Sequence, residues 1–344
     1  FPYIFFVGLA SVAAGTLNSL GYFTIPALAP VFLNISFIIT GAMLMYFPLG
    51  STEKAVVVFA IGALVGGLLQ LLIQVPKLLK TGHSFTIDPD FRDRGVRWIG
   101  SLLLPAVMGL AVTQIDVLVD MILATTLREG TVTALRLGNR IAIQPVGIFS
   151  VAIATVTLPT LSAYAARDER AKLTSDLLFS LRLTFTLMLP STVLLISLAR
   201  PLVRLLFERG EFTSSVSTPM TARALAYYAI GLFAYGGIKV TVQGFYSLKD
   251  TRTPVKIGTL MVALNIILNL ILVRYLEHAG LALATSLSSA IGFIIMLLVL
   301  RKRLEGLRLK DIIECIGRVG VASLGMGVVI YYASRSLEGF AQTL

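Results

Sequence analysis

The sequence predicts an all-α, polytopic helical membrane protein, and three observations support that prediction. Hydrophobic residues make up 56% of the 344-residue chain and charged residues only 14%, while the mean hydropathy is +0.87. Soluble domains carry roughly 25% charged residues, so a water-soluble fold could not hide this much apolar surface. The apolar residues also fall in runs of about 20, the length at which a helix crosses a bilayer.

Ten runs are candidate membrane spans. In chain order they are Pro2–Phe23, Val31–Phe47, Ala55–Val75, Trp98–Leu123, Gln144–Tyr164, Leu177–Ala199, Thr221–Tyr246, Val255–Val273, Gly280–Leu300 and Ile312–Ser334. We expect the connectors to hold the helix breakers, namely Pro26, Pro30, Pro89, Pro201, Pro219 and Pro254. The chain begins at Phe1 inside an apolar run and without a signal-peptide pattern, so we expect an internal piece of a longer protein.

The net charge of +11 has a topological explanation. Eighteen Lys and Arg residues fall in four alternate segments, 77–97, 167–182, 249–256 and 301–318, whereas nine fall on the opposite side. Basic residues accumulate in cytoplasmic loops, so the four segments are predicted to be cytoplasmic. Nucleic-acid binding is not needed to explain the charge.

Two connectors and a repeat add detail to this plan. The polar, basic segment 83–97 is predicted to be a cytoplasmic linker, and Arg200–Thr218 an amphipathic helix in the outer interface. The first two spans resemble the seventh and eighth: in each pair a Pro-bearing turn joins the two spans, and the second span contains Asn34 or Asn265. A repeat at an offset of about six spans predicts two parallel lobes, a plan found in transporters.

Oxygen-bearing side chains at membrane depth are candidates for a cation or proton site. Asp116 and Asp120 are four residues apart in the fourth span, and Asn265 and Asn269 repeat that spacing in the eighth. Thr285 follows in the ninth span, with Ser286, Ser288 and Ser289. Intramembrane acids face protein or water and are functional by default. The alternative is that these groups are polar contacts that hold helices together.

Basic residues near the spans are candidates for binding an anionic substrate. An arginine facing a cavity matches the oxygens of a diphosphate, and Arg140, with Arg136 one turn earlier, lies near the start of the fifth span. Lys239 lies in the seventh span beside Gly236 and Gly237, which allow close helix approach or a hinge. Each cation could instead extend to the interface.

Catalytic and metal motifs are missing from the sequence. The single cysteine, Cys315, and two distant histidines in loop-like contexts, His83 and His278, give no Cys/His metal spacing. The chain has no G-x-x-x-x-G-K-[ST] motif and no plausible Ser/His/Asp set. We therefore predict a transporter that is not an enzyme and has no cofactor.

Four stretches between residues 114 and 258 resemble, in order, the MurJ/MviN family of lipid II flippases. They are QIDVLVDMILATTL, NRIAIQPVGIFSVAIATVTLPTLS, LLFERGEFT and FYSLKDTRTPVKIG. The resemblance implies a two-lobe fold of fourteen spans in the multidrug/oligosaccharidyl-lipid/polysaccharide (MOP) superfamily, of which this chain would lack the first three and the last. It implies alternating access that moves lipid-linked peptidoglycan precursor outward across the bacterial inner membrane for cell-wall synthesis.

The same resemblance implies a division of the chain. Residues 1–76 would be the second half of the N-terminal lobe, with three helices, and residues 77–97 a cytoplasmic inter-lobe linker. Residues 98–300 would be the six-helix C-terminal lobe, and residues 301–344 a cytoplasmic loop and an additional C-terminal helix. The implied partners are lipid II and membrane lipids, with cell-wall synthesis or division proteins as further candidates.

Site residues follow from the resemblance position by position. Arg140 matches a cavity arginine proposed to meet the substrate diphosphate, although Asn139 stands where many relatives carry an acid. Positions associated with a sodium site match Asp120, Asn265, Asn269 and Thr285, and Asn269 stands where an acid can occur.

The alternative functions are another exporter of the superfamily, for drugs or polysaccharide units, and a non-transporting scaffold for cell-wall enzymes.

Overall fold

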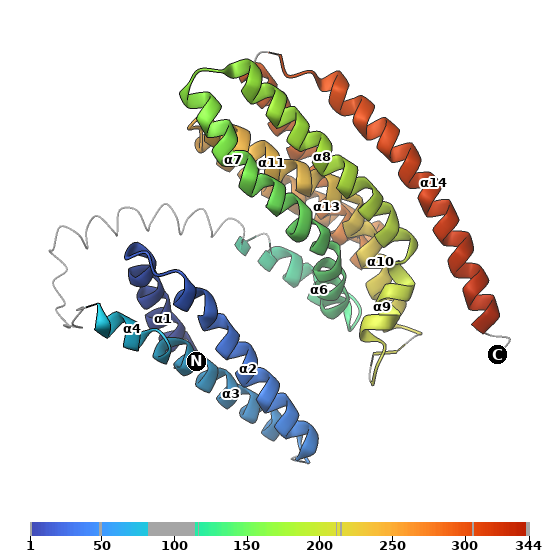
Figure 1. Ribbon diagram of the computed structural model, residues 1–344. Coiled ribbons are helices and arrows are strands. Elements are labelled where there is room, and N and C mark those ends of the chain that lie inside the picture. The colour runs from blue at the N-terminus through green and yellow to red at the C-terminus, as the bar shows by residue number, and fades with distance from the viewer. Residues whose placement is uncertain are drawn as a thin grey trace. The chain divides into compact units, whose positions relative to one another are not determined.

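The computed structural model describes residues 2–47, 50–81, 114–115, 117–210, 212–213, 215–304 and 306–341. Contacts divide the chain into two compact units, Phe1–Val96 and Arg97–Leu344 (Figure 1). Asp116, most of the predicted linker and most of the predicted fourth span lie outside the described residues. The division into lobes that the sequence suggested stays a prediction.

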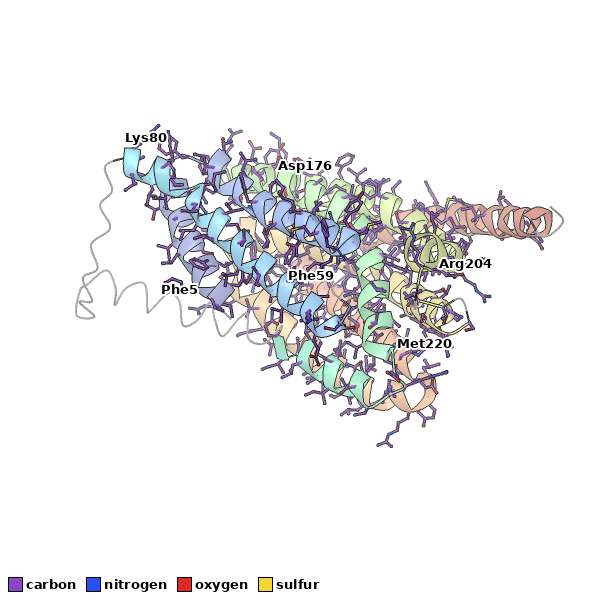
Figure 2. The ribbon with its side chains drawn as sticks, turned by 90° about the horizontal axis from the view of Figure 1, so that it is seen from below. Phe5, Phe59, Lys80, Asp176, Arg204 and Met220 are labelled. Atoms are coloured by element: carbon purple, nitrogen blue, oxygen red, sulfur yellow. The ribbon has the colours of Figure 1, made fainter. Side chains whose placement is uncertain are left out.

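The described residues of the first unit form three long helices and one short one. They are α1 Pro2–Ser19, α2 Thr24–Tyr46, α3 Thr52–Leu72 and α4 Val75–Lys80. Small residues let α2 and α3 approach closely, and the Ser36 hydroxyl donates to the Gly62 carbonyl at 2.6 Å. Large apolar side chains such as Phe5 and Phe59 (Figure 2) are exposed on this unit, at 65% and 41%.

The second unit is a helical bundle. Its helices are α6 Thr131–Ala142, the π-helix η1 Val146–Ser150, α7 Val151–Ala166, α8 Arg170–Ser197, α9 Ala199–Phe207, α10 Ser217–Ile230, α11 Leu232–Ser247, α12 Arg252–Leu276, α13 His278–Arg303 and α14 Leu309–Ala341. Residues 117–125 are also helical. Helix α11 packs against α7, α8 and α13, while α14 lies along α8 (Figure 1).

The core of this bundle forms where α8, α11 and α13 meet. Phe185 and Phe293 are buried edge to face, with ring centroids 5.7 Å apart. A Cβ added at Gly237 would lie 2.6 Å from the Phe293 ring, so only glycine allows this approach. The predicted role of Gly237 in close helix packing is therefore confirmed.

The number of membrane spans agrees with the sequence where the two can be compared. In the described ranges, eight helices are long and apolar enough to cross a membrane, or nine if α10 and α11 form one bent span. Nine of the ten predicted spans lie mainly in those ranges. The all-α membrane fold is therefore confirmed.

The proline prediction needs correction. Pro26, Pro201, Pro219 and Pro254 all lie within the first turn of a helix, where no intrahelical bond from their nitrogen is required. Pro30 lies inside α2, because membrane helices tolerate proline when neighbouring groups satisfy the freed carbonyl. Among the described residues, these five prolines thus lie in the first turn of a helix or inside one, and Pro89 lies outside the described residues.

The predicted amphipathic helix is shorter than the segment 200–218. Helix α9 ends at Phe207. Val203 is fully buried, Leu205 is 72% exposed and Arg204 projects from the outside of α9 (Figure 2). The predicted segment therefore contains one short amphipathic helix, α9, and the rest of the segment connects α9 to α10.

Candidate functional site

A chain of hydrogen bonds links four of the predicted cation-site residues. Asn269 Nδ2 donates to Asp120 Oδ1 and to Asn265 Oδ1, both at 2.6 Å. Asn265 Nδ2 donates to Thr285 Oγ1 at 3.2 Å and, more weakly, to Ser288 Oγ at 3.5 Å. The two amides are fully buried or nearly so, at 0% and 2% exposed.

The local sequence explains how these residues meet. Asn265 and Asn269 lie one turn apart on α12, so they share a face of that helix. Helix α13 follows directly after Glu277 and packs along α12, which brings Thr285 and Ser288 to the same face. Asp120 reaches them from the helical segment 117–125, 149 residues earlier in the chain than its amide partner.

The donor set fits a hard monovalent cation better than a transition metal. It offers a carboxylate, two amide oxygens and a hydroxyl, which are the ligand types that hard cations prefer. No group of three His, Cys, Asp or Glu residues among the described residues is arranged to hold a metal ion. In these hydrogen bonds the amide nitrogens of Asn265 and Asn269 face the oxygens of Thr285 and Asp120. A cation bound among these residues would require both amides to turn their oxygens toward it instead.

The hydrogen-bond chain reaches two cavities of the second unit. A cavity of about 130 Å³ is lined by Asp120, Arg136 and Asn139, together with Tyr228. A larger one of about 560 Å³ is lined by Asn265, Thr285, Ser288 and Lys239. Asp120 at the smaller cavity is thus linked by hydrogen bonds, through Asn269, to Asn265 at the larger one.

The structure separates the predicted substrate-binding cations. Arg136 and Lys239 each line one of the two cavities and are exposed. Arg140 lies in the last turn of α6 with an exposed side chain, and its carbonyl accepts from Gln144 Nε2 at 3.2 Å. The sequence predicted that Arg140 lies near the start of a new span. In the structure Arg140 lies near the end of the amphipathic helix α6, and the chain then continues through η1 into α7.

The seventh span contains a break at a position where the sequence predicted none. Helices α10 and α11 bend by 42° at Gly231, five residues before the glycines suggested as a hinge. The Ser286 hydroxyl donates to the carbonyls of Tyr227 at 2.7 Å and Tyr228 at 3.2 Å, so it satisfies groups that the break exposes. Serines at such positions give no periodic signal in a sequence.

The turn between α11 and α12, on the predicted cytoplasmic side, is fixed by Asp250. Its Oδ1 accepts from the backbone N–H groups of Arg252 at 3.1 Å and Thr253 at 3.0 Å, and Oδ2 lies 2.6 Å from Arg303. Hydrogen bonds from the Thr253 side chain and backbone, with the charge of Arg303, lower the pKa of the Asp250 carboxyl. The carboxylate therefore ties the turn to the end of α13.

The helical fold, the buried polar residues and the cavities together define a polytopic helical membrane protein with a polar interior, and its fold is similar to those of known transporters. The fold resembles a solved multidrug resistance MATE family transporter of the MOP superfamily, inward-facing, with a TM-score of 0.72 at 19% identity, over 89% of this chain and 70% of that one. That likeness concerns the fold alone. A solved lipid II flippase MurJ, in an inward closed conformation, matches with a TM-score of 0.77 at 26% identity, over 100% of this chain and 73% of that one.

Sequence comparisons narrow the class further. A family model described as lipid II flippase MurJ matches residues 1–343. A probable lipid II flippase MurJ of Vibrio cholerae is 35% identical over 86% of this chain and 55% of its own length. One of Haemophilus influenzae is 31% identical over 99% of this chain and 67% of its own length. The chain belongs to the MurJ family, and as such is a multi-pass protein of the bacterial inner membrane.

The chain spans little more than half the length of several of these relatives. The Vibrio cholerae protein is covered to 55% and a Burkholderia cenocepacia lipid II flippase MurJ, 34% identical, to 58%. Family membership is therefore shown for the chain.

Proposed function

We propose that this chain forms part of a flippase that moves lipid II from the cytoplasmic to the periplasmic leaflet for cell-wall synthesis. The observation that carries the proposal is the match of the MurJ family model to residues 1–343, supported by the fold. The motion is alternating access, in which a substrate-facing cavity opens to one side at a time. Lipid II and membrane lipids are the proposed partners, along with cell-wall synthesis or division proteins.

Arg140 is the proposed contact for the diphosphate of the cargo. Its guanidinium is always charged and presents paired donors that match phosphate oxygens. It lies where α6 gives way to Pro145 and the π-helix η1, and such irregular turns are frequent at functional sites. Arg136, Asn139 and Lys239 are proposed to contribute further contacts from the two cavity walls.

Growth of cells that depend on the protein tests this assignment. We expect Arg140→Ala, in the full-length protein, to abolish complementation of a flippase-depleted strain at normal expression. Arg200→Ala, which removes another exposed arginine from the start of α9, is the matched control and should complement. Normal growth with Arg140→Ala at wild-type protein levels would remove Arg140 from the proposal.

We also propose that sodium binds at Asp120, Asn265, Asn269 and Thr285. Support comes from the oxygen donor set and from the burial of both amides. Asp116 is proposed as a secondary acid of the same span and lies outside the described residues. The ion would supply positive charge that holds the Asp120 carboxylate against α12, a role now played by the Asn269 amide.

A thermal-shift measurement distinguishes a sodium site from a purely structural contact. In purified full-length protein, NaCl should raise the melting temperature more than the same concentration of KCl, and Asp120→Asn should abolish that difference. Asp176→Asn, which changes a half-buried acid of α8 (Figure 2), should retain it. Equal shifts in NaCl and KCl for the wild type would leave the hydrogen bonds as structural contacts and reject the ion.

A second candidate is an exporter of another class in the same superfamily. The similarity to the MATE-type transporter favours it as far as the fold goes. Direct binding separates the two, because a lipid II flippase should bind lipid II more tightly than undecaprenyl-linked O-antigen units or cationic drugs. A non-transporting scaffold would bind none of these and would tolerate removal of Arg140. No catalytic residue is assigned in any of these proposals.

A further inference from the structure

A third cavity lies at the end of the second unit opposite the Asp250–Arg303 contact, the end predicted to face outward. Its volume is about 300 Å³, and it is lined by Leu127, Arg128, Thr131, Pro219, Met220, Arg223, Glu277 and His278. It shares no lining residue with the cavities that contact Asp120 and Asn265. Figure 2 marks its place by Met220, at the start of α10.

Three helices begin around this cavity. Thr131 is the first residue of α6, Pro219 and Met220 lie in the first turn of α10, and His278 is the first residue of α13. Helix starts carry a partial positive charge and backbone N–H groups that favour anions. Convergence of three of them at one cavity concentrates that effect.

The lining side chains add to the positive potential. Arg128 and Arg223 line the cavity and are exposed, whereas Glu277 is the single acid among the described residues that line it. Glu208, an acid in the connector between α9 and α10, accepts instead from the Thr218 hydroxyl at 2.8 Å and pairs with Arg204 at 3.6 Å. Two guanidinium groups are thus available to a ligand in the cavity.

His278 supplies the observation that points to a ligand. The sequence placed it in a loop, yet it lines this cavity with only 5% of its surface exposed. The imidazole interacts with the Met220 backbone, and within the described parts of the chain its Nε2 atom is buried without a hydrogen-bond partner. A buried polar atom without a partner is costly, and a phosphate can satisfy it in either protonation state, because its oxygens accept and a P–OH group donates.

We propose that this cavity binds a phosphate group, held by Arg128 and Arg223 and hydrogen-bonded to His278. The volume is at the lower end of ligand pockets, which suits a phosphate rather than a large solute. The phosphate can come from a lipid headgroup of the outer leaflet or from a small solute. The chemistry is common to both, and the proposal does not depend on what the flippase carries.

The test uses the purified full-length protein and two probes. Inorganic phosphate is titrated by calorimetry in lipid-free detergent. Retention of phosphatidylglycerol is compared with retention of a phosphate-free glycosyl diacylglycerol by native mass spectrometry. We expect Arg128→Gln/Arg223→Gln to weaken phosphate binding about tenfold or more, because two charge-assisted hydrogen bonds are lost. Arg200→Gln, the matched control on α9, should bind as the wild type does.

Each result has a defined meaning. If the wild type binds inorganic phosphate and the double variant does not, the site takes a phosphate solute. If the double variant loses phosphatidylglycerol but keeps the phosphate-free glycosyl diacylglycerol, the site takes a lipid headgroup. His278→Phe should weaken either binding, and the exposed arginines keep the test valid if that variant fails to fold. The proposal is overturned if the wild type binds neither probe, or if Arg200→Gln weakens binding as much as the double variant.

Discussion

The hydrogen bond between Asn269 and Asp120 allows a quantitative prediction. Replacing both residues by alanine, singly and together, defines a double-mutant cycle for this contact. Hydrogen bonds inside membrane bundles average about 0.6 kcal/mol and reach about 1.7 kcal/mol. Asn269 is fully buried, the two atoms are 2.6 Å apart and the acceptor is a carboxylate, so we expect a coupling energy near the upper limit, about 1.5 kcal/mol.

Equilibrium unfolding in mixed detergent micelles measures that energy. The control cycle combines Asp120→Ala with Ser323→Ala, because the Ser323 hydroxyl bonds the Val319 carbonyl of its own helix, α14. Independent sites add within about 0.3–0.5 kcal/mol, so the control should be additive within that error. A coupling energy between Asp120 and Asn269 that is no larger than the control would refute the reasoning that this contact holds the segment 117–125 against α12.

Three further substitutions test other contacts through the melting temperature. Asp250→Asn should lower the melting temperature at pH 7. Because the pKa of Asp250 is lowered in the folded protein, the difference in stability between wild type and variant should vanish as pH falls through that pKa. A difference that does not change with pH would contradict this. Gly237→Ala should cost about 1–3 kcal/mol by forcing a Cβ against Phe293, whereas Gly258→Ala, with open space, should not, and equal effects would count against the packing argument. Ser286→Ala should cost about 1 kcal/mol at the Gly231 break, and an unchanged melting temperature would exclude this role.

Much of the fold follows from the sequence because a membrane constrains helices so strongly. Backbone groups in lipid must bond internally, so apolar runs of the right length become helices. Proline misled the prediction because its effect depends on position: Pro254 lies in the first turn of α12, where proline is well tolerated, and Pro30 lies inside α2. Local composition cannot distinguish these positions.

The candidate cation site was predictable in part. The spacing of Asn265 and Asn269 places both amides on one face of a helix, whatever the tertiary fold. Their bond to Asp120 depends on packing between segments 149 residues apart, which no local pattern reports. His278 illustrates the opposite error, since a histidine beside Glu277 resembles a loop residue and only tertiary packing buries it.

The long sequence separation of Asp120 from Asn269 bears on how the protein is made. A ribosome adds about 5–20 residues per second, so roughly 7–30 s pass between synthesis of the carboxylate and synthesis of its amide partner. During that interval the aspartate has no Asn269 to bond, and an aspartate at the centre of a membrane helix costs about 2.5–3.5 kcal/mol to insert. The segment 117–125 therefore depends on the insertion machinery, or on a position near the bilayer surface, until α12 has been made.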